Sequence, residues 1–217
     1  MSHIAIVGGN GQVARHVITQ LVADGHLPVA LVRNPAYAHD LKQLGAQVRL
    51  LDIEQDAVEH YAAAFAECDA VVFAAGGGPD GNIERKRTVD LGGSLTSIEA
   101  AKQAGISRFV QISAINVDKP VPDDAAPVWK AYVEAKREAD AALRGSGLDW
   151  TILRPGRLTD DGGTGQVTLG DTVERGEIPR ADVAAVVVAV LDQPTSIGRQ
   201  WDVVGGQTPV EEAVASA

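Results

Sequence analysis

The stretch Ile4-Ala5-Ile6-Val7-Gly8-Gly9-Asn10-Gly11-Gln12-Val13-Ala14, near the start of the chain, decides the fold. Its four apolar residues are typical of a buried strand, its glycines of a tight turn, and the residues from Gln12 onward of a helix. A strand that passes directly into a helix through such a turn is the first half of a βαβ unit, and repeated units of this kind build a parallel sheet. The opening of the chain therefore predicts an α/β fold.

The same alternation continues to about Leu153. The predicted strands are His3–Val7, Pro28–Val32, Gln47–Leu51, Asp69–Phe73, Arg108–Ile112 and Asp149–Leu153. Most are continuous apolar runs, as expected of strands that are covered on both faces. The predicted helices are Gln12–Asp24, Ala36–Leu44, Ala57–Glu67, Ile83–Ala104 and Val128–Arg144. Gly25, Gly45 and Gly105 follow three of them, where a left-handed cap favours glycine. This order predicts a Rossmann-like, doubly wound parallel sheet.

The remainder, Arg154–Ala217, is less regular. It predicts substrate-side loops over 154–180, a helix over Pro179–Leu191, a strand over Arg199–Val204 at the sheet edge, and a loosely held tail over 211–217. We expect these residues to form a small C-terminal cap over the carboxyl ends of the strands, where such sheets bind ligands. Because the sequence has no repeat, linker or break in composition, we expect residues 1–217 to be one domain.

Composition narrows the possible function. The chain has 217 residues, 45% of them apolar, and 19 Lys and Arg against 29 Asp and Glu, for a net charge of −10. Such a charge repels phosphate backbones and anionic lipid, so it predicts neither nucleic-acid nor membrane-surface binding. The one cysteine, Cys68, cannot form an intramolecular disulfide, and we expect it to be a small buried residue rather than a nucleophile. No apolar run reaches 18 residues and the start is no secretory signal, so we expect a cytoplasmic protein.

The glycine turn predicts a phosphate site. Two registers fit, Gly9-x-Gly11-x-x-Ala14 and Gly8-x-x-Gly11-x-x-Ala14, and both allow close approach of the backbone to a pyrophosphate at the start of a helix. The alternative is a glycine-rich turn without a ligand. The expected contacts of the pyrophosphate are Gly8, Asn10, Gly11, Gln12 and Val13.

The end of the second strand indicates which dinucleotide binds. An NAD site usually has an acidic residue about 20 positions past the glycines, where it holds the ribose hydroxyls. Here that place is taken by Arg33, and no acidic residue lies between Asp24 and Asp40. A guanidinium pairs with the 2′-phosphate of NADP, which a carboxylate repels. We therefore expect NADP(H), with NAD possible; the alternative is a solvated loop arginine.

Two further strand ends belong to the same predicted site. Asp52 and Ile53 follow the third strand, where the aspartate can bond to adenine and the isoleucine can pack on it. Ala74, Ala75 and Gly76 follow the fourth strand, where small residues let a dinucleotide pass close to the backbone.

These motifs, together with Phe109-Val110-Gln111-Ile112-Ser113-Ala114 and Tyr132-Val133-Glu134-Ala135-Lys136, resemble the short-chain dehydrogenase/reductase superfamily. Ala135-Lys136 with Ala139-Asp140, followed by Leu143–Gly156, is similar to its atypical NAD(P)H-binding branch, which includes NmrA-like proteins and biliverdin-IXβ and flavin reductases. The resemblance covers nearly the whole chain and implies one NAD(P)-binding domain.

The resemblance implies a catalytic set of Ser113, Tyr132 and Lys136. Tyr132 and Lys136 are four residues apart, so they share one helical face and can reach the same ribose. We therefore also expect Lys136 to contact the ribose of the coenzyme. A lysine near a phenol lowers the pKa of the phenol, which lets the tyrosine give a proton to a carbonyl oxygen as hydride arrives. Ser113 would orient that oxygen. The alternative is that Tyr132, with Trp129, packs near the start of its helix.

Some residues depart from the family pattern or point to no site. Biliverdin-IXβ reductases carry a histidine after the sixth strand, where this chain has Arg157. Arg157, Leu158, Val167 and Leu169 suggest a mixed apolar and cationic wall for the substrate. Asp160 and Asp161 lack the spacing of a calcium loop, and the five histidines lack that of a zinc site, so we expect no metal.

The sequence thus predicts an NADP(H)-dependent oxidoreductase that transfers hydride between nicotinamide and a small carbonyl, quinone or flavin-like acceptor. One alternative is a non-catalytic NADP(H)-sensing regulator of the NmrA-like type. Another is a sugar-nucleotide or isoprenoid-type enzyme, although those generally need a larger substrate domain. The expected partner is a small-molecule substrate, and the expected state is a monomer or weak homodimer.

Overall fold

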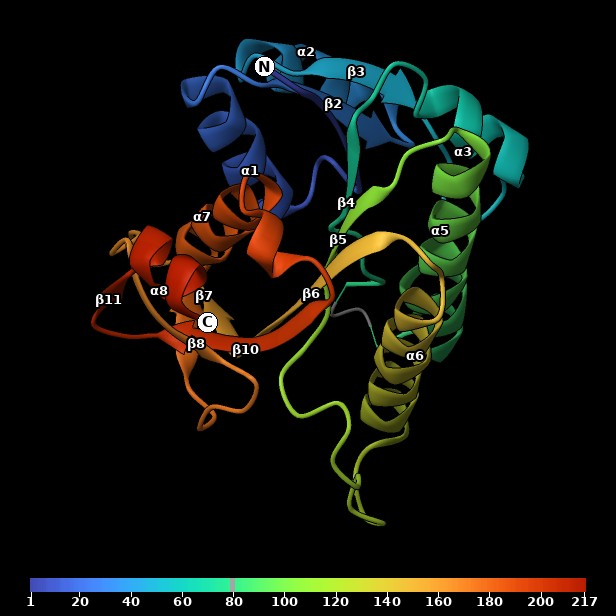
Figure 1. Cartoon of the computed structure of the whole chain (residues 1–217). Helices are drawn as coiled ribbons and strands as arrows, with labels where there is room; N and C mark the ends of the chain where they lie inside the picture. Colours follow the sequence, from blue (N-terminus) through green and yellow to red (C-terminus); the bar gives the residue numbers. More distant parts are fainter. Residues whose placement is uncertain (79–80) are drawn as a thin grey trace.

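The computed structural model describes residues 1–78 and 81–217, and in this part of the chain nine strands form one sheet with helices on both faces (Figure 1). Its order is β11-β8-β10-β6-β5-β4-β1-β2-β3. The strands from β10 to β3 are all parallel, whereas β8 runs antiparallel to both β10 and β11. The strands of this sheet are β1 (His3–Val7), β2 (Leu27–Val32), β3 (Gln47–Leu50), β4 (Ala70–Phe73), β5 (Arg108–Ile112), β6 (Asp149–Pro155), β8 (Gln166–Gly170), β10 (Arg199–Gly205) and β11 (Thr208–Pro209).

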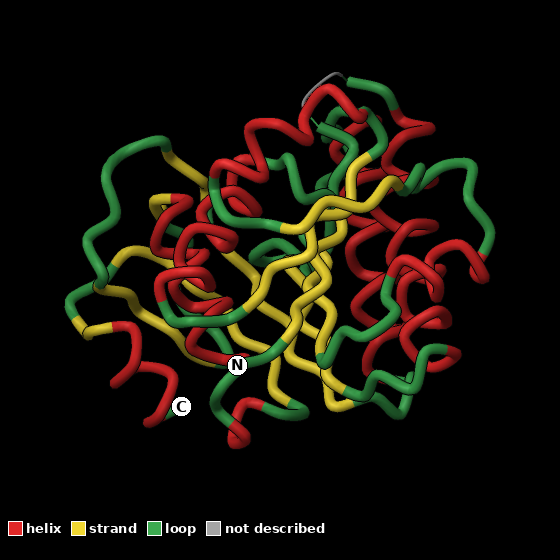
Figure 2. Tube along the Cα trace, turned by 90° about the horizontal axis from the view of Figure 1, so that it is seen from above, coloured by secondary structure: helices red, strands yellow, loops and turns green. Residues whose placement is uncertain are grey.

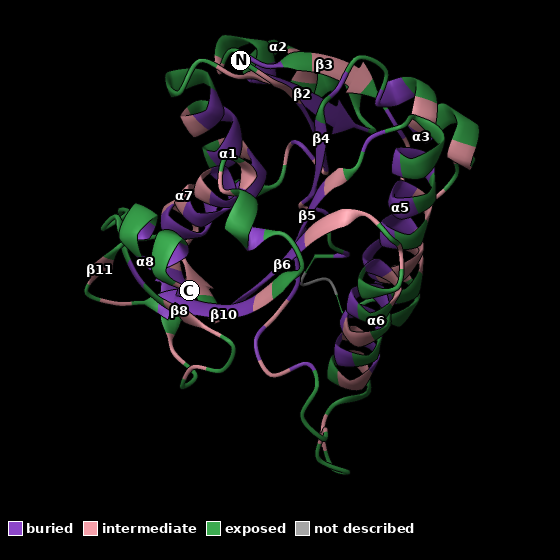
Figure 3. Ribbon diagram, viewed as in Figure 1, coloured by how far each residue is buried: buried purple, intermediate pink, exposed green. Residues whose placement is uncertain are grey.

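Two apolar clusters, one on each face of the sheet, hold the helices in place. Figure 2 shows the strands as a layer between two groups of helices. In Figure 3 the inner strands are mostly buried, whereas β3 at the sheet edge and the outer sides of the helices are partly exposed. One cluster joins α1, α2, α7 and α8 to the sheet, and the other joins α3, α5 and α6 to it. These helices are α1 (Gln12–Ala23), α2 (Ala38–Gln43), α3 (Val58–Ala64), α5 (Ser94–Gln103), α6 (Pro127–Arg144), α7 (Arg180–Leu191) and α8 (Val210–Ser216).

The topology places a crevice at the carboxyl ends of β1 and β4. The chain runs outward from β1 through β2 to β3 and then returns to β4 on the other side of β1. Val7, the last residue of β1, pairs with Leu31 of β2 and Phe73 of β4, so the three strands end close to one line. A reversal of strand order of this kind is where ligands bind in open α/β sheets. The doubly wound parallel sheet predicted from the sequence is confirmed.

The segment 83–104 is not the single helix that the sequence predicted. It consists of a short α4 (Ile83–Arg85), a π-helical segment η2 (Lys86–Gly93) and α5. A Cβ at Gly93 would lie 2.4 Å from Cγ2 of Ile53, so this segment packs closely on the loop after β3. The wider π turn buries Lys86 and Asp90 together with Val89, and such turns frequently occur at functional sites.

The C-terminal part differs from the prediction in three ways. Strand β10 lies inside the sheet, between β6 and β8, rather than at its edge. The expected loops over 154–180 contain β8 and a separate two-stranded sheet of β7 (Arg157–Thr159) and β9 (Glu177–Pro179). The expected loose tail forms α8, which packs against α7 and buries Val214.

Other local predictions hold. Gly25, Gly45 and Gly105 have φ values of +79°, +94° and +73°, as left-handed helix caps require. Cys68 is buried, and burial raises the pKa of its thiol.

Two short 3₁₀ helices complete the described elements: η1 (Pro35–Tyr37) lies just before α2, and η3 (Pro194–Ser196) follows α7. Within the described ranges no helix combines the length and the apolar character that a bilayer crossing would need.

Candidate functional site: a two-part trough around the glycine turn

The turn between β1 and α1 is wedged between the ends of the two strands that flank β1. Gly8 has a φ of +80°, and a Cβ there would lie 2.8 Å from the Cα of Ala75. At Gly9, a Cβ would lie 2.7 Å from the Cβ of Ala30. Side chains do not pack this closely, so the turn needs glycine at both positions. One glycine lets the turn contact the end of β4, and the other lets it contact β2.

Helix α1 begins directly after this turn with its first backbone N–H groups free of intrahelical partners. Its N-cap residue is Gly11, whose N–H donates to the Gly8 carbonyl over 2.8 Å. The N–H groups of Gln12 and Val13 precede the first intrahelical bond, and both residues line a cavity in front of the turn. The positive end of the helix dipole lies at the same place. The arrangement suits a phosphate or pyrophosphate.

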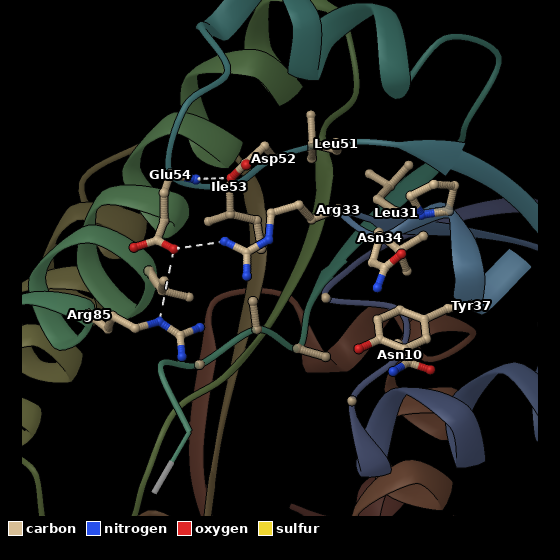
Figure 4. A pocket seen from close by; sticks show the side chains of 18 residues that line it. Asn10, Leu31, Arg33, Asn34, Tyr37, Leu51, Asp52, Ile53, Glu54 and Arg85 are labelled. Carbon is tan, nitrogen blue, oxygen red and sulfur yellow. Dashed lines mark hydrogen bonds and ion pairs between the residues drawn. The ribbon is translucent and has the colours of Figure 1, made fainter. Parts of the chain in front are cut away.

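On one side of the turn, a cavity of about 720 Å³ opens at the carboxyl ends of β2 and β3 (Figure 4). Most of the predicted coenzyme contacts line it: Gly8, Asn10, Gly11, Arg33, Asp52, Ile53, Ala74, Ala75 and Gly76. The side-chain oxygen of Asn10 accepts a hydrogen bond from Arg15 Nη1 over 3.0 Å, so its amide is held at the rim. Leu31 and Leu51 add apolar walls.

Arg33 points into this cavity and pairs with an acidic residue that the sequence reasoning missed. Its Nη1 lies 3.2 Å from Oε2 of Glu54. The other oxygen, Oε1, accepts a hydrogen bond of 2.7 Å from the Thr88 hydroxyl, and Arg85 Nε lies 3.9 Å from Oε2. Figure 4 shows Arg33 and Arg85 converging on this carboxylate. Glu54 follows Asp52 and Ile53 directly in the sequence. This adjacency to two predicted coenzyme contacts was the sequence signal that could have identified it.

Asp52 is held by hydrogen bonds within the loop after β3. Its Oδ1 accepts a hydrogen bond of 3.0 Å from the Glu54 N–H, and its own N–H donates to Oδ2 of Asp56 over 2.7 Å. The carbonyl of Ile53 accepts from the Tyr61 hydroxyl over 2.9 Å. These bonds fix the loop after β3, and they leave one oxygen of Asp52 without a bond from within this loop.

A second cavity, of about 630 Å³, lies on the other side of the turn. It is lined by Ser113, Tyr132 and Lys136, the three residues predicted to be catalytic, and by Gln12 and Val13. The two cavities share Gly11, Ala74, Ala75 and Gly76. They therefore form one trough that passes in front of the helix start, and the structure brings every predicted site residue to it.

Lys136 forms a buried ion pair with Asp90, a partner that the sequence reasoning also missed. Its Nζ lies 3.3 Å from Oδ1 of Asp90, with side-chain exposures of 6% and 1%, and 3.2 Å from the Ile112 carbonyl. The second oxygen, Oδ2, accepts a hydrogen bond of 2.8 Å from the Gly77 N–H. Asp90 thereby ties Lys136 to the backbone that follows β4. It lies in η2, far from Lys136 in the sequence, and the spacing of residues along the chain gave no signal for this pair.

Tyr132 lies among aromatic and charged groups. Its ring centroid lies 5.5 Å from that of Trp129, and the Nζ atoms of Lys86 and Lys136 each lie 6.0 Å from the ring centroid. Burial raises the pKa of its phenol, Lys136 lowers it, and Asp90 raises it further, with a net upward shift. The expectation that the lysine lowers this pKa overall is therefore wrong. Asp90 lies beside Lys136 and offsets its charge, and burial dominates.

Ser113 is the outermost donor of a buried polar network. Its hydroxyl donates to Oδ2 of Asp140 over 2.9 Å, and Arg154 Nε donates to the same oxygen, also over 2.9 Å. Gln111 donates to the other oxygen over 2.8 Å. Arg154 continues through Nη1 to Asp118, 2.7 Å away. Since the serine proton points to Asp140, the lone pairs of the Ser113 oxygen are what it can offer to a group in the cavity.

The residues after β6 contribute less than expected to the cavity wall. Leu158 lines the second cavity, but Arg157 is exposed and paired with Glu177, Val167 lies in the core and Leu169 packs against it. The C-terminal part of the chain contributes Arg180 to the lining, beside Lys86 and Lys136 from earlier segments. Sequence reasoning missed Arg180 because the start of α7 is far along the chain from the motifs, and only the folded structure places it beside the cavity.

The trough has the features that a nicotinamide dinucleotide needs. The turn excludes side chains where a pyrophosphate would approach, the helix start offers N–H donors to it, and one cavity on each side provides room for a nucleoside. The residues that would hold the dinucleotide are those shared by the two cavities, with Arg33, Asp52 and Ile53 at one end and Lys136 at the other.

Known proteins support this assignment. A family model described as NAD(P)H-binding matches residues 8–194. An uncharacterized sugar epimerase of Bacillus subtilis, YhfK, is 38% identical, with 97% of this chain and 98% of that protein covered. A solved structure from Bacillus halodurans, provisionally described as an NAD-dependent epimerase/dehydratase, has a TM-score of 0.93 at 37% identity and full coverage of both chains.

A third match points to the reductases. The structure of ChuY, an anaerobillin reductase from Escherichia coli O157:H7, has a TM-score of 0.78 at 26% identity and covers 95% of this chain and 98% of that one. Together these matches confirm the resemblance to the atypical branch that includes NmrA-like proteins and biliverdin-IXβ reductases. The chain belongs to the NAD(P)H-binding family.

Proposed function

We propose that the protein is an NADP(H)-dependent oxidoreductase that reduces a small carbonyl, quinone or flavin-like acceptor. The observation that carries this proposal is the meeting of Ser113, Tyr132 and Lys136 in one cavity that is continuous with the dinucleotide trough. The reductase among the structural relatives supports the same reaction class. When bound, the coenzyme supplies the hydride. The residues of the chain bind and orient the coenzyme and the acceptor, and they supply the proton.

Each of the three residues has a role that its contacts suggest. Tyr132 carries its proton at neutral pH, as an ordinary phenol does, and it faces the cavity, so we assign it as the proton donor to an acceptor oxygen. Lys136, held by Asp90 and the Ile112 carbonyl, has donor capacity left for the hydroxyls of a ribose. Ser113 accepts a hydrogen bond in the cavity and so orients a hydroxyl, either that of Tyr132 or that of an alcohol product.

The acceptor site combines an aromatic wall with nearby cations. Trp129 and Tyr132 line it together with Val13, and Leu158 adds an aliphatic surface. Arg180 lies at its edge, with Nη1 2.7 Å from Oδ1 of Asp160. A wall of this composition suits a flat conjugated acceptor better than a small aliphatic aldehyde.

Turnover of NADPH against a panel of quinones, flavins, azo dyes and aldehydes tests the reaction. We expect oxidation of NADPH with at least one member, and a loss of about 100-fold or more in kcat for Tyr132→Phe if the tyrosine is the proton donor. Full turnover by Tyr132→Phe would exclude that role. Tight coenzyme binding without turnover on the whole panel would instead favour the non-catalytic NADP(H) sensor.

The choice of NADP(H) over NAD(H) rests on Arg33. Its guanidinium is 61% exposed and points into the cavity at the end of β2, where it can pair with a 2′-phosphate. We expect Arg33→Glu to weaken NADPH binding by about tenfold or more without weakening NADH binding. Arg199→Glu is the matched control, because Arg199 is exposed at the amino end of β10, the opposite end from the trough. An unchanged coenzyme preference in Arg33→Glu would remove the assignment.

A further inference from the structure

We propose that Glu54 is the second determinant of coenzyme choice. Glu54 supplies, from the loop after β3, the acidic group that NAD sites usually place after β2. It thereby reduces the preference for NADPH over NADH that Arg33 creates. The inference rests on the coenzyme binding proposed above. It concerns only the adenosine end of the trough, so it can fail while coenzyme binding stands.

Glu54 is the fixed member of the Arg33–Glu54 pair. Both of its carboxylate oxygens are engaged, one by the Thr88 hydroxyl at 2.7 Å and the other by Arg33 at 3.2 Å. Its side chain is 20% exposed, whereas that of Arg33 is 61% exposed. The shorter acidic side chain is thus held between the loop after β3 and η2, and the long guanidinium side chain is the one with room to move.

The two coenzymes place opposite demands on this pair. The 2′-phosphate of NADP carries about two negative charges near pH 7, so a fixed carboxylate in the same cavity opposes its binding and competes for Arg33. The ribose of NAD has a free 2′-hydroxyl in its place, and a hydroxyl donates to a carboxylate. Glu54 therefore weakens NADPH binding and strengthens NADH binding.

The guanidinium of Arg33 reduces the repulsion between Glu54 and the 2′-phosphate of NADP but does not remove it. Arginine has five N–H donors, and Arg33 uses one of them on Glu54 in this structure. The remaining donors are available to a phosphate, so Arg33 can contact both anions. This predicts a protein that accepts both coenzymes and prefers NADPH only modestly.

Calorimetric titration of Glu54→Gln with NADPH and NADH tests the inference. The substitution keeps the shape of the side chain and removes its charge. We expect NADPH to bind about tenfold more tightly than to the wild type and NADH to bind several-fold more weakly. The same titrations with adenosine 2′,5′-bisphosphate and 5′-AMP, which contain no nicotinamide, should show shifts in the same directions. Glu59→Gln is the control, since Glu59 is an exposed carboxylate on α3 outside both cavities.

The outcomes separate this inference from the function on which it rests. If the wild type binds neither coenzyme, the proposed function fails. If the wild type binds coenzyme and Glu54→Gln changes the ratio of NADPH to NADH affinity no more than Glu59→Gln does, the role of Glu54 is wrong and coenzyme binding stands. Glu54→Ser is the second variant in case the glutamine variant does not fold, and the same change in ratio is expected for it.

Discussion

The phenol of Tyr132 shows how burial, aided by nearby carboxylates, can reverse an expectation about a pKa that was drawn from sequence spacing. Spacing places Lys136 on the same helical face and predicts a lowered pKa. The structure adds Asp90, which pairs with Lys136, and Asp140 deeper in the protein, while Lys86 lies on the ring. Burial and the two carboxylates outweigh the lysine, so the pKa is raised. The helix pattern includes Asp140 but reveals neither the burial of the ring nor Asp90, which comes from another segment.

Removal of the Asp90 charge should reduce the upward shift in the pKa of the Tyr132 phenol. In Asp90→Asn, Lys136 loses its counter-ion and its charge acts on Tyr132 alone, so we expect the pKa of the phenol to fall. In the wild type the Tyr132 phenol has a raised pKa, so it loses its proton only in alkaline solution. In the variant we expect the loss to begin at a lower pH than in the wild type. Ultraviolet titration of the phenolate, with Tyr132→Phe in both backgrounds to identify the signal, measures the change.

The same variant should be less stable, which provides an independent check. An unpaired lysine that is 6% exposed costs about 3 kcal/mol in free energy of unfolding. Urea denaturation at neutral pH measures that cost, and Glu59→Gln again controls for the loss of one negative charge. If the phenol titrates at the same pH in Asp90→Asn as in the wild type, the Asp90–Lys136 pair does not control the proton on Tyr132.

Among the elements, the β1–α1 turn was predictable and its packing was not. The order of strand, glycines and helix predicts the turn from local rules alone. Gly8 contacts the end of β4 because β4 pairs with β1 in the sheet. The sequence of the turn does not reveal which strand takes that position. The same limit explains Glu54, which is adjacent to Asp52 in sequence yet reaches Arg33 only because β3 lies next to β2.

Two glycine-to-alanine substitutions separate backbone strain from packing. Gly8 and Gly25 have nearly equal φ values, +80° and +79°, but a Cβ at Gly25 meets nothing within 4 Å whereas one at Gly8 meets Ala75. We expect Gly25→Ala to lower the free energy of unfolding by about 1 kcal/mol. Gly8→Ala should cost about 1–3 kcal/mol more and should also abolish coenzyme binding. Equal losses of stability in urea denaturation would mean that the turn does not pack as described.

Helix α8 was missed because it is short and its apolar residues meet their partners only in the folded chain. Seven residues carry too little periodicity to distinguish a helix from a tail, and burial against α7 and β8 decides the matter. Val214 is 1% exposed. We expect Val214→Asp to lower the free energy of unfolding by about 3 kcal/mol, and Glu212→Ala, on the exposed side of α8, to change it by less than about 0.5 kcal/mol. If Val214→Asp is as stable as the wild type, residues 211–217 are the loose tail that the sequence suggested.

Across the whole molecule, the core of the sheet was the part most open to sequence reasoning. All six strands from β1 to β6 were placed within about two residues. Most of them are buried on both faces and are continuous apolar runs, whereas β3 lies at the edge and is only partly buried. Beyond β6 the sheet continues through β10 to β8 and β11, and the last two turn antiparallel. Antiparallel strands such as β8 expose part of their surface, so their sequence lacks the apolar run that identified the others.

The candidate site shows the same division. Each residue predicted from a motif lines the trough, because motifs mark the carboxyl ends of strands and parallel strands end together. Two acidic partners of those residues, Glu54 and Asp90, come from other segments, and their contacts follow from tertiary structure alone. The sequence therefore locates the site, and the structure determines its electrostatics.

Isothermal titration of the wild-type protein with NADPH and with NADH is the decisive test of the trough. Its two halves meet at Gly11 in front of the start of α1, so one dinucleotide should bind per chain. We expect saturable binding of both coenzymes, tighter for NADPH, with adenosine 2′,5′-bisphosphate as a competitor and with Gly8→Ala inactive in binding. No heat of binding with either coenzyme at millimolar concentration, from protein that is folded by circular dichroism, would contradict it.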